Sequence, residues 1–304
     1  MPELPEVETV ARGLQREVVG RTIVGVTLRK TDFIDDPAEL EEHLPGRKIV
    51  AVERYGKFML LRLSASDVST ANGEQDALMV HLGMTGMLRP QAVSEPQLKH
   101  THVVLPLDDG RELRYVDPRR FGRMAYLSGE ALQSELRRHG LDPLEMRFEE
   151  FAANTGKRRA RIKALLLDQS VLRGVGNIYT DESLWKAKIH PAHLGARLKP
   201  DQLRRLYGAL QQVLQKAIAL RGSSISDFLD AEGVPGEYQQ HHRVYGREGK
   251  ACSRCKTPIR RIIVAGRSSY FCPTCQKAPR GWKKSKRPLR FVAQRKRKTA
   301  ATKL

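Results

Sequence analysis

Residues 1–20 read MPELPEVETVARGLQREVVG, and this stretch contains the first periodic pattern of the chain. Its apolar residues recur at the spacing of one helix face and stop before Gly20, a residue that favours helix ends. They are Val7, Val10, Ala11, Leu14 and Val18. The pattern predicts an amphipathic helix from about Val7 to Gly20. Glu3, Glu6 and Glu8 stand where a secretory signal needs basic residues, so we expect no signal peptide and a cytoplasmic protein.

Seven short β-rich runs follow this helix, with turn residues such as Pro45-Gly46 between them. They cover residues 22–28, 48–52, 58–63, 78–82, 102–107, 112–116 and 123–127. Because no helical pattern separates successive runs, an antiparallel sandwich or barrel is favoured over a parallel sheet. Residues 67–76 predict a surface insertion between two strands, and we assign it no role.

The periodicity becomes helical from about Gly129. Helices are expected at residues 160–167, 180–187 and 201–220, the last with one apolar stripe. The long connection at residues 221–249 contains five glycines and Pro235, and we interpret it as a functional loop. The predicted fold class is therefore α+β, with an N-terminal antiparallel β-sandwich, its capping helix and a helical second domain.

All four cysteines of the chain lie in one short segment. Cys252 and Cys255 are separated from Cys272 and Cys275 by sixteen residues, and each pair has two residues between its members. This spacing places four thiolates around zinc, and a full shell of four leaves no position for a water nucleophile. We expect one structural Zn per chain, with two disulfides as the alternative. Arg260, Arg261 and Arg267 between the pairs suit a finger that grips phosphates, or are simply solvated.

The charge of the chain indicates a polyanionic partner. The formal net charge of the 304 residues is +20, and residues 276–304 hold twelve Lys or Arg and no acid. Nucleic acid is the leading candidate partner. The clustered charges of residues 281–304 predict disorder, and we hypothesise that this tail adds nonspecific phosphate contacts. No apolar run approaches the ~18 residues that a membrane span needs, so we expect no membrane partner.

Two common catalytic motifs are missing. The sequence has no Gly-x-Ser-x-Gly, and its Gly-Lys pairs precede Phe58, Arg158 and Ala251 in place of the Ser or Thr of a phosphate-binding loop. These absences argue against a serine hydrolase and against an ATPase.

The chain resembles the formamidopyrimidine-DNA glycosylases. The resemblance rests on MPELPEVET at 1–9, GK at 56–57, HLGMTG at 81–86, DPRRFG at 117–122, IK at 162–163, GVGNIY at 174–179 and YFCPTC at 270–275. It implies a catalytic β-sandwich domain at residues 1–128, a helix-two-turn-helix domain with a lesion-capping loop at 129–249, a zinc ribbon at 250–280 and a basic tail at 281–304. The implied partner is double-stranded DNA with oxidised bases or abasic sites, bound by a monomer in the nucleoid.

The resemblance also implies the chemistry. Without Met1, Pro2 offers a secondary amine, and α-amines titrate near ~7.7 to 8.0, so part of the population is neutral at physiological pH. The implied reaction is excision of an oxidised purine through a Schiff base on Pro2, followed by β,δ-elimination. Glu3 is the implied general acid/base, Lys57 approaches the damaged nucleotide, and Glu6 is a second carboxylate near the site. Each also has an ordinary explanation, because Pro and Glu favour the first helical turn and a lone lysine is usually solvated.

The remaining implied residues hold the DNA. Met84, Arg119 and Phe121 match a triad that fills the stack after the base is extruded, although Met and Phe near strand ends are usually core residues. His100, Lys163, Asn177 and Arg267 are implied DNA contacts, with a helix cap as the alternative for Asn177. The loop at 222–236 corresponds to the segment that closes over the base. Its Ser223-Ser224 replaces a common Thr-Thr, and Ser226 stands where a basic residue is frequent, which leaves the lesion preference open.

Two rival functions stay open. An endonuclease VIII-type glycosylase removes oxidised pyrimidines with the same nucleophile, but it generally has Gly where this chain has Leu4. A catalytically inactive zinc-finger DNA-binding protein would retain only the basic surface and the finger, and the intact Pro2 and Glu3 argue against it.

Overall fold

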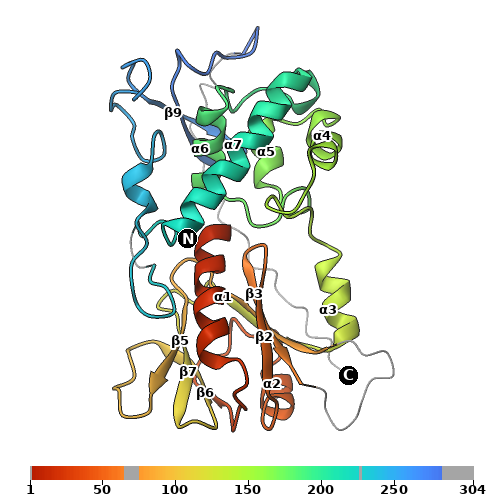
Figure 1. Cartoon of the computed structure of the whole chain (residues 1–304), viewed down its shortest axis with the longest axis vertical. Helices are drawn as coiled ribbons and strands as arrows, with labels where there is room; N and C mark the ends of the chain where they lie inside the picture. Colours follow the sequence, from red (N-terminus) through yellow and green to blue (C-terminus); the bar gives the residue numbers. More distant parts are fainter. Residues whose placement is uncertain (1, 65–74, 226–227, 283–304) are drawn as a thin grey trace, which may run out of the picture.

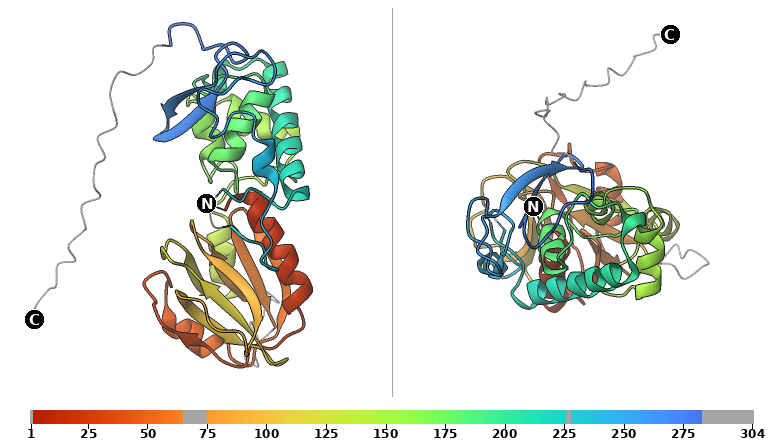
Figure 2. Two further views of the ribbon diagram at one scale, coloured as in Figure 1. Left: turned by 90° about the vertical axis from the view of Figure 1, so that its left-hand side faces the viewer. Right: turned by 90° about the horizontal axis from the view of Figure 1, so that it is seen from above.

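The structure is a computed structural model, and it describes residues 2–64, 75–225 and 228–282. The predicted insertion at 67–76 lies largely outside these residues, and so do Ser226 and nearly all of the basic tail. Two antiparallel four-stranded sheets form the first lobe (Figures 1 and 2). One contains, in spatial order, β2 (Ile49–Tyr55), β3 (Phe58–Leu63), β4 (Ala77–His81) and β8 (Arg123–Leu127). The other contains β1 (Thr27–Leu28), β6 (Thr101–Pro106), β7 (Arg111–Val116) and β5 (Met87–Ala92).

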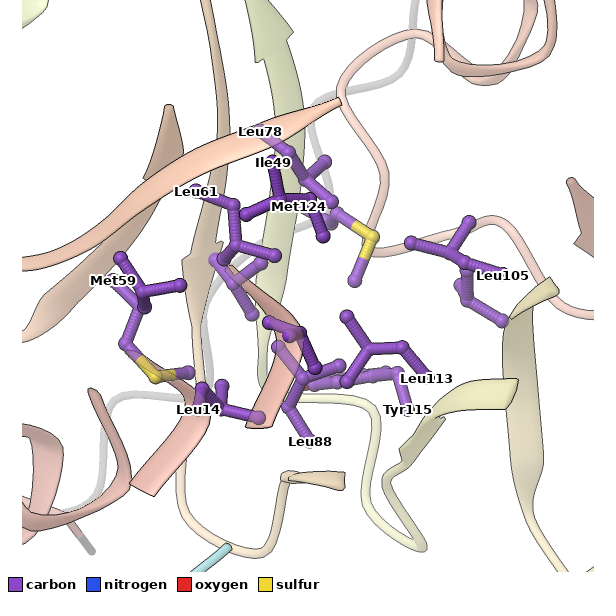
Figure 3. Packing of buried hydrophobic residues seen from close by; sticks show 14 of the residues in the cluster. Leu14, Ile49, Met59, Leu61, Leu78, Leu88, Leu105, Leu113, Tyr115 and Met124 are labelled. Carbon is purple, nitrogen blue, oxygen red and sulfur yellow. The ribbon is translucent and has the colours of Figure 1, made fainter. Parts of the chain in front are cut away.

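The core of this lobe lies between the two sheets. Leu61 and Met124 come from one sheet, Leu113 and Tyr115 from the other, and Leu14 from the N-terminal helix α1 (Leu4–Val18) (Figure 3). All five side chains are fully buried. Burying each large apolar side chain contributes roughly 1.5–3 kcal/mol, so this shared cluster fixes the sheets and the helix relative to one another. The predicted sandwich with a capping helix is confirmed.

The second lobe is helical. Its helices are α4 (Phe148–Gly156), α5 (Ile162–Leu167), α6 (Asn177–Lys186) and α7 (Pro200–Ala219). A short 3-10 helix, η2 (Tyr238–His241), follows α7, and another, η1 (Gly195–Arg197), precedes it. The helix α3 (Gly129–Leu136) belongs to the first lobe, because its Leu132 packs on the outer face of the β3–β4–β8 sheet. A two-stranded ribbon of β9 (Arg260–Val264) and β10 (Arg267–Phe271) ends the described chain.

Helix α1 joins the lobes. Its Leu14 and Val18 pack in the sandwich, whereas Leu4 is buried in the core of the helical lobe. The start of the chain therefore lies at the waist between the lobes, as Figure 1 and the left view of Figure 2 show. Arg54 reinforces this junction, because its guanidinium lies 2.7 Å from both the Glu8 carboxylate of α1 and the Asp142 carboxylate of the interlobe segment.

The elements differ from the predictions where local signals were weak. The predicted strand at 22–28 is reduced to Thr27–Leu28, and Thr22 and Ile23 make only isolated bridges. Strand β5 was missed because Pro90 interrupts its pattern, and proline is tolerated there because β5 is an edge strand. Helix α2 (Pro37–His43) was also missed, although Asp36 caps it by accepting a hydrogen bond from the Ala38 amide at 3.0 Å.

Among the described residues, no helix is both long enough and apolar enough to cross a lipid bilayer.

Candidate active site

The start of α1 is inserted between the lobes. Pro2 is buried, and the backbone amide of Leu4 donates a hydrogen bond to the Gly174 carbonyl of the helical lobe at 3.0 Å. Helix α1 begins at Leu4, earlier than predicted, because the Glu6 carboxylate accepts a hydrogen bond from the Glu3 amide at 2.8 Å. This capping fixes the backbone immediately after Pro2.

The Glu3 carboxylate binds the N-terminus of α6. It accepts hydrogen bonds from the amides of Gly176 at 3.0 Å and Ile178 at 2.9 Å, with the Tyr179 amide at 3.4 Å. Burial raises the pKa of Glu3, while the positive charge of Lys57 and the amides of α6 oppose that shift. The residue next to Pro2 is thus a buried carboxyl held at a helix N-terminus, which is the kind of environment that suits a general acid/base.

Glu6 forms a second buried carboxyl site. Besides the Glu3 amide, it accepts hydrogen bonds from the Tyr179 hydroxyl and, at 2.6 Å, from the Ser223 amide. Burial and the nearby charge of Glu3 raise the pKa of Glu6 to about 7. Glu6 therefore does more than cap α1, because it links that helix to α6 and to the start of the loop at 222–236.

Lys57 lies in the tight turn between β2 and β3 and is partly buried. Burial lowers its pKa, the carboxylates of Glu3 and Glu6 oppose this, and Arg267 of the ribbon lowers it further. The charge of Lys57 therefore interacts with the carboxylates of Glu3 and Glu6 and with the guanidinium of Arg267. The structure brings these four predicted residues close enough for Lys57 to interact with the other three, and Glu3 directly follows Pro2 in the chain.

The predicted insertion triad is exposed on the first lobe. The side chains of Met84 and Phe121 are 38% and 57% exposed, so neither is a core residue. The Arg119 guanidinium lies 4.5 Å from the centre of the Phe121 ring. Arg119 and Phe121 thus form one preassembled cation–π pair.

A single buried carboxylate holds both loops of the triad. Asp117 accepts hydrogen bonds from the Thr85 hydroxyl at 2.6 Å and from the Arg119 and Gly122 amides at 3.2 and 3.0 Å. Thr85 follows Met84, so Asp117 connects the first loop to the second. Gly83 has φ +59°, and a Cβ there would collide with the Phe121 backbone. Sequence reasoning gave Asp117 no role, although it begins the DPRRFG motif.

His100 lies beside this arrangement. It is exposed, adopts a left-handed φ of 70°, and its carbonyl accepts a hydrogen bond from the Asp117 amide at 3.1 Å. Its contribution to DNA binding stays a prediction.

The predicted phosphate contact of Lys163 requires an accessible ammonium group, which the structure does not show. Lys163 is fully buried, and its ammonium lies 2.7 Å from both the Asp181 carboxylate and the Ser268 carbonyl. Asp181 also accepts a hydrogen bond from the Tyr270 amide at 2.9 Å. In this structure the pair joins α5 and α6 to strand β10, the strand that begins with Arg267.

Asn177 is the first residue of α6 and is partly buried. Its Oδ1 atom is buried and has no hydrogen-bond partner among the described residues. The amides that we expected to bind phosphate at this helix end are occupied by Glu3 instead. A phosphate at this position would therefore contact the Asn177 side chain.

Arg267 is exposed at the start of β10 and follows the tight turn Ala265-Gly266, in which both residues have positive φ. Among the ribbon arginines, Arg261 has an acidic partner, because its guanidinium lies 2.9 Å from the Glu248 carboxylate. Sequence reasoning missed this pair because Glu248 precedes the ribbon.

The four cysteines form the expected metal site. The sulfur atoms of Cys252, Cys255, Cys272 and Cys275 all lie within 4.8 Å of one another. Cys255 Sγ is 3.4 Å from Cys272 Sγ and 3.5 Å from Cys275 Sγ, too far for a disulfide. Tetrahedral Zn²⁺ with bonds of ~2.3 Å requires sulfur atoms about 3.8 Å apart, so the site fits one zinc ion.

Two further residues of the site, Tyr179 and Glu182, were given no role in the prediction, although Tyr179 ends the GVGNIY motif. Tyr179 and Glu182 lie on α6, and the Glu182 carboxylate accepts hydrogen bonds from the amides of Arg243, Val244 and Tyr245 at 2.9–3.0 Å. Most of these partners are more than 60 residues apart in the chain, so no local pattern reveals them.

The chain matches three family models. The formamidopyrimidine-DNA glycosylase N-terminal domain matches residues 1–124, the formamidopyrimidine-DNA glycosylase H2TH domain matches 139–229, and the zinc finger found in FPG and IleRS matches 249–278.

Curated relatives and solved structures agree with these matches. Formamidopyrimidine-DNA glycosylases of Solibacter usitatus and Herpetosiphon aurantiacus are 48% and 43% identical, over 91% of this chain and 100% of theirs. The Lactococcus lactis Fpg, solved in complex with DNA that contains an abasic site, is 34% identical with a TM-score of 0.82, over 91% of this chain and 100% of its own.

Proposed function

Because the chain belongs to the formamidopyrimidine-DNA glycosylase family, we propose that Pro2, held at its waist, is the nucleophile that this glycosylase uses. Family membership makes the protein a base-excision-repair DNA glycosylase with AP lyase activity. The proposal concerns which residues carry the reaction and which lesions are removed. The observation that supports it is that Pro2 is buried and directly precedes Glu3, a buried carboxyl whose backbone amide is bound by the buried carboxylate of Glu6.

The reaction begins with the amine of Pro2 after Met1 has been removed. Its nitrogen attacks C1′ of the damaged nucleotide, the bond from C1′ to the base breaks, and the base leaves with a proton. The sugar ring then opens: the nitrogen loses its proton, the C1′–O4′ bond breaks, and O4′ leaves as a hydroxyl, which forms an iminium between Pro2 and C1′. This iminium makes the C2′ proton acidic. Loss of that proton expels the 3′ phosphate, and a second elimination expels the 5′ phosphate, which leaves a one-nucleotide gap.

Glu3 is placed to move protons during these steps. Burial raises its pKa above the ordinary carboxyl value, and a carboxyl can both donate and accept a proton. Lys57 supplies a positive charge that burial has already partly removed from water, as its lowered pKa indicates, so its approach to the sugar and its phosphates costs little further desolvation. Glu6 holds the helix ends and the loop that surround these groups.

Met84, Arg119 and Phe121 are the proposed wedge. Extruding a base costs a few kcal/mol of stacking, and an apolar, a cationic and an aromatic side chain on one exposed surface can replace the lost contacts. His100, Asn177, Lys163 and Arg267 are the proposed DNA-binding residues, with Lys163 acting in this structure through the strand that carries Arg267. The zinc ion holds the ribbon and takes no part in the chemistry.

We propose domain limits at residues 1–128, 129–249, 250–280 and 281–304, and oxidised purines in duplex DNA as the substrates. Related complexes include DNA with a carbocyclic 8-oxo-G and, for the Lactococcus lactis protein, DNA with an oxidised pyrimidine. Because the second complex contains an oxidised pyrimidine, a preference for oxidised pyrimidines, as in endonuclease VIII-type glycosylases, stays an alternative for this chain. Action as a monomer, and in the cytoplasm, stays a prediction from the sequence.

Borohydride trapping tests the proposal. Reduction should link the protein through Pro2 to duplexes that contain 8-oxoguanine, faster than to duplexes that contain an oxidised pyrimidine, and peptide mass analysis locates the link. The matched control is the same chain with Met1 retained, which has no free amine on Pro2. Equal trapping of the Met1-bearing protein would overturn the role of Pro2, and faster trapping on the pyrimidine would overturn the lesion preference.

A further inference from the structure

A line of hydrogen-bonded side chains leads away from Glu6 to His242. The Tyr179 hydroxyl donates to Glu6, the Ser223 hydroxyl lies 3.4 Å from that of Tyr179, and His242 Nε2 lies 3.1 Å from Ser223 Oγ. Ser223 and His242 are only 5% and 8% exposed. The last member of this line, His242, has no part in the proposed reaction.

Ser223 stands at the beginning of the loop at 222–236 and binds Glu6 through its own amide at 2.6 Å. Gly222 before it has φ +78°, and a Cβ there would lie 2.6 Å from the Glu6 carboxylate, so this point of the loop is in close contact with α1. Small changes in the position of Ser223 therefore alter the place where the loop leaves the active site.

The other side of the loop base is fixed by the neighbouring serine. The Ser224 hydroxyl donates to the Phe228 carbonyl at 2.7 Å and accepts from the Gly236 amide at 2.8 Å. The Ser224 amide donates to the side-chain oxygen of Gln239 at 3.0 Å. Ser224 thus closes the loop on itself, whereas Ser223 attaches it to the active site.

His242 is a neutral hydrogen-bonding group in these surroundings. Burial, with smaller contributions from Arg247 and His241, lowers its pKa to about 4. With the proton on Nε2, His242 donates to Ser223, Ser223 donates to Tyr179, and Tyr179 donates to Glu6. Each donor in such a series polarises the next, which strengthens the bonds. The ring also packs edge-on against Tyr238 and Tyr245, at 5.7 and 5.6 Å between centres.

We propose that His242 is a positioning residue for base excision: through Ser223 it holds the start of the 222–236 loop against Glu6. In the proposed function this loop is the segment that meets an extruded base, so a substrate that has already lost its base does not need it. His242 should therefore influence excision of the base much more than cleavage at a preformed abasic site. This inference rests on the proposed function.

The decisive variant is His242→Phe, which keeps an aromatic ring between Tyr238 and Tyr245 but cannot bind Ser223. Losing one buried hydrogen bond costs about 1–1.5 kcal/mol, so excision of 8-oxoguanine in single-turnover experiments should slow by about tenfold. Cleavage of a duplex with a preformed abasic site should change less than about twofold on the same argument. His242→Gln restores a donor and should recover most of the excision rate.

Three further variants complete the test. Ser223→Ala should slow excision like His242→Phe, and the double variant should be no slower than either one, because both break the same line of bonds. His241→Phe is the matched control, since His241 is the neighbouring histidine and contacts Lys216 on the other side, at 3.1 Å.

The outcomes separate this inference from the proposed function. Equal slowing on both substrates, no slowing, additive losses in the double variant, or no recovery with His242→Gln would each overturn the role of His242. An unmodified protein that cleaves neither substrate would instead overturn the proposed function.

Discussion

The Glu3 carboxylate lies 2.9 Å from the backbone amide of Ile178, so the acid beside Pro2 caps a helix of the opposite lobe. Catalytic geometry and the junction between the lobes therefore depend on the same side chain. A glutamine at this position retains one acceptor oxygen but turns an NH₂ group toward the amides of α6.

Glu3→Gln should abolish most excision and lower the free energy of unfolding by about 1–3 kcal/mol, the cost of an unsatisfied buried donor. Single-turnover excision and urea denaturation measure the two effects. Glu17→Gln, at the far end of α1, is the control, because the partly exposed carboxylate of Glu17 pairs with Arg111 of strand β7 at 2.7 Å. Wild-type excision by Glu3→Gln would contradict the assignment of Glu3.

Asp117→Asn should loosen the wedge. An asparagine keeps one acceptor oxygen, which can serve Thr85 and Arg119, but its NH₂ group cannot accept the bond from the Gly122 amide, so the loop that carries Phe121 loses part of its support. We expect about tenfold weaker binding to lesion-containing duplexes, because one or two buried hydrogen bonds are lost. Fluorescence of 2-aminopurine placed opposite the lesion reports the insertion. The exposed Asp108→Asn is the control, and full insertion by Asp117→Asn would rule out this role.

The pH dependence of stability contains a contribution from His81. Burial, together with the charges of Lys57 and Arg123, lowers its pKa from 6.5 to about 4. The unfolded chain then binds a proton at a higher pH than the folded protein, so stability is full above pH 6.5 and is lost as the pH falls toward 4. His81→Asn keeps an acceptor for the Gly83 amide but does not titrate. Its unfolding free energy should fall less between pH 7 and pH 5, and an unchanged pH slope would refute this assignment.

Removing zinc should disable DNA binding before it affects the sandwich. The ribbon is held on α6 by Trp185, which packs with Cys252 and Cys272, so its strands lose their support without metal. A strong chelator should release one zinc per chain and lower DNA affinity, and added Zn²⁺ but not Mg²⁺ should restore it. Full DNA affinity after complete metal release would contradict the structural role.

Truncation after Trp282 tests the basic tail. Each phosphate contact contributes about 0.9 to the slope of log affinity against log salt, so the shortened protein should show a flatter dependence. A variant of equal length with the tail lysines and arginines changed to glutamine should behave like the truncation. An identical slope in all three proteins would show that the tail makes no phosphate contacts.

The parts that could be predicted from the sequence depend on neighbours in the chain. The cysteine spacing, the apolar stripe of α1 and the order of sandwich, helices and ribbon are local patterns. The edge strand β5 and the short helix α2 were missed, because Pro90 hides the first and seven residues give too little periodicity for the second.

The contacts that organise the site, in contrast, join residues that are far apart in the chain. Glu3 and Ile178 are 175 residues apart, and Lys163 and Ser268 are 105 apart. No pattern in a single sequence shows that Lys163, which was predicted to bind phosphate, is buried and paired with Asp181. Nor does one show that a helix end expected to bind DNA is already bound by a carboxylate of the same chain.

The burial of Leu4 in the helical lobe has a practical consequence for work with this enzyme. An affinity tag fused to the amino end would block the amine, and the buried setting of Pro2 leaves it little room, so purification handles belong at the other end. It also means that neither lobe expressed by itself contains a finished reaction centre. The specific activity of a preparation therefore reports the fraction of molecules in which the two lobes are folded and packed against each other.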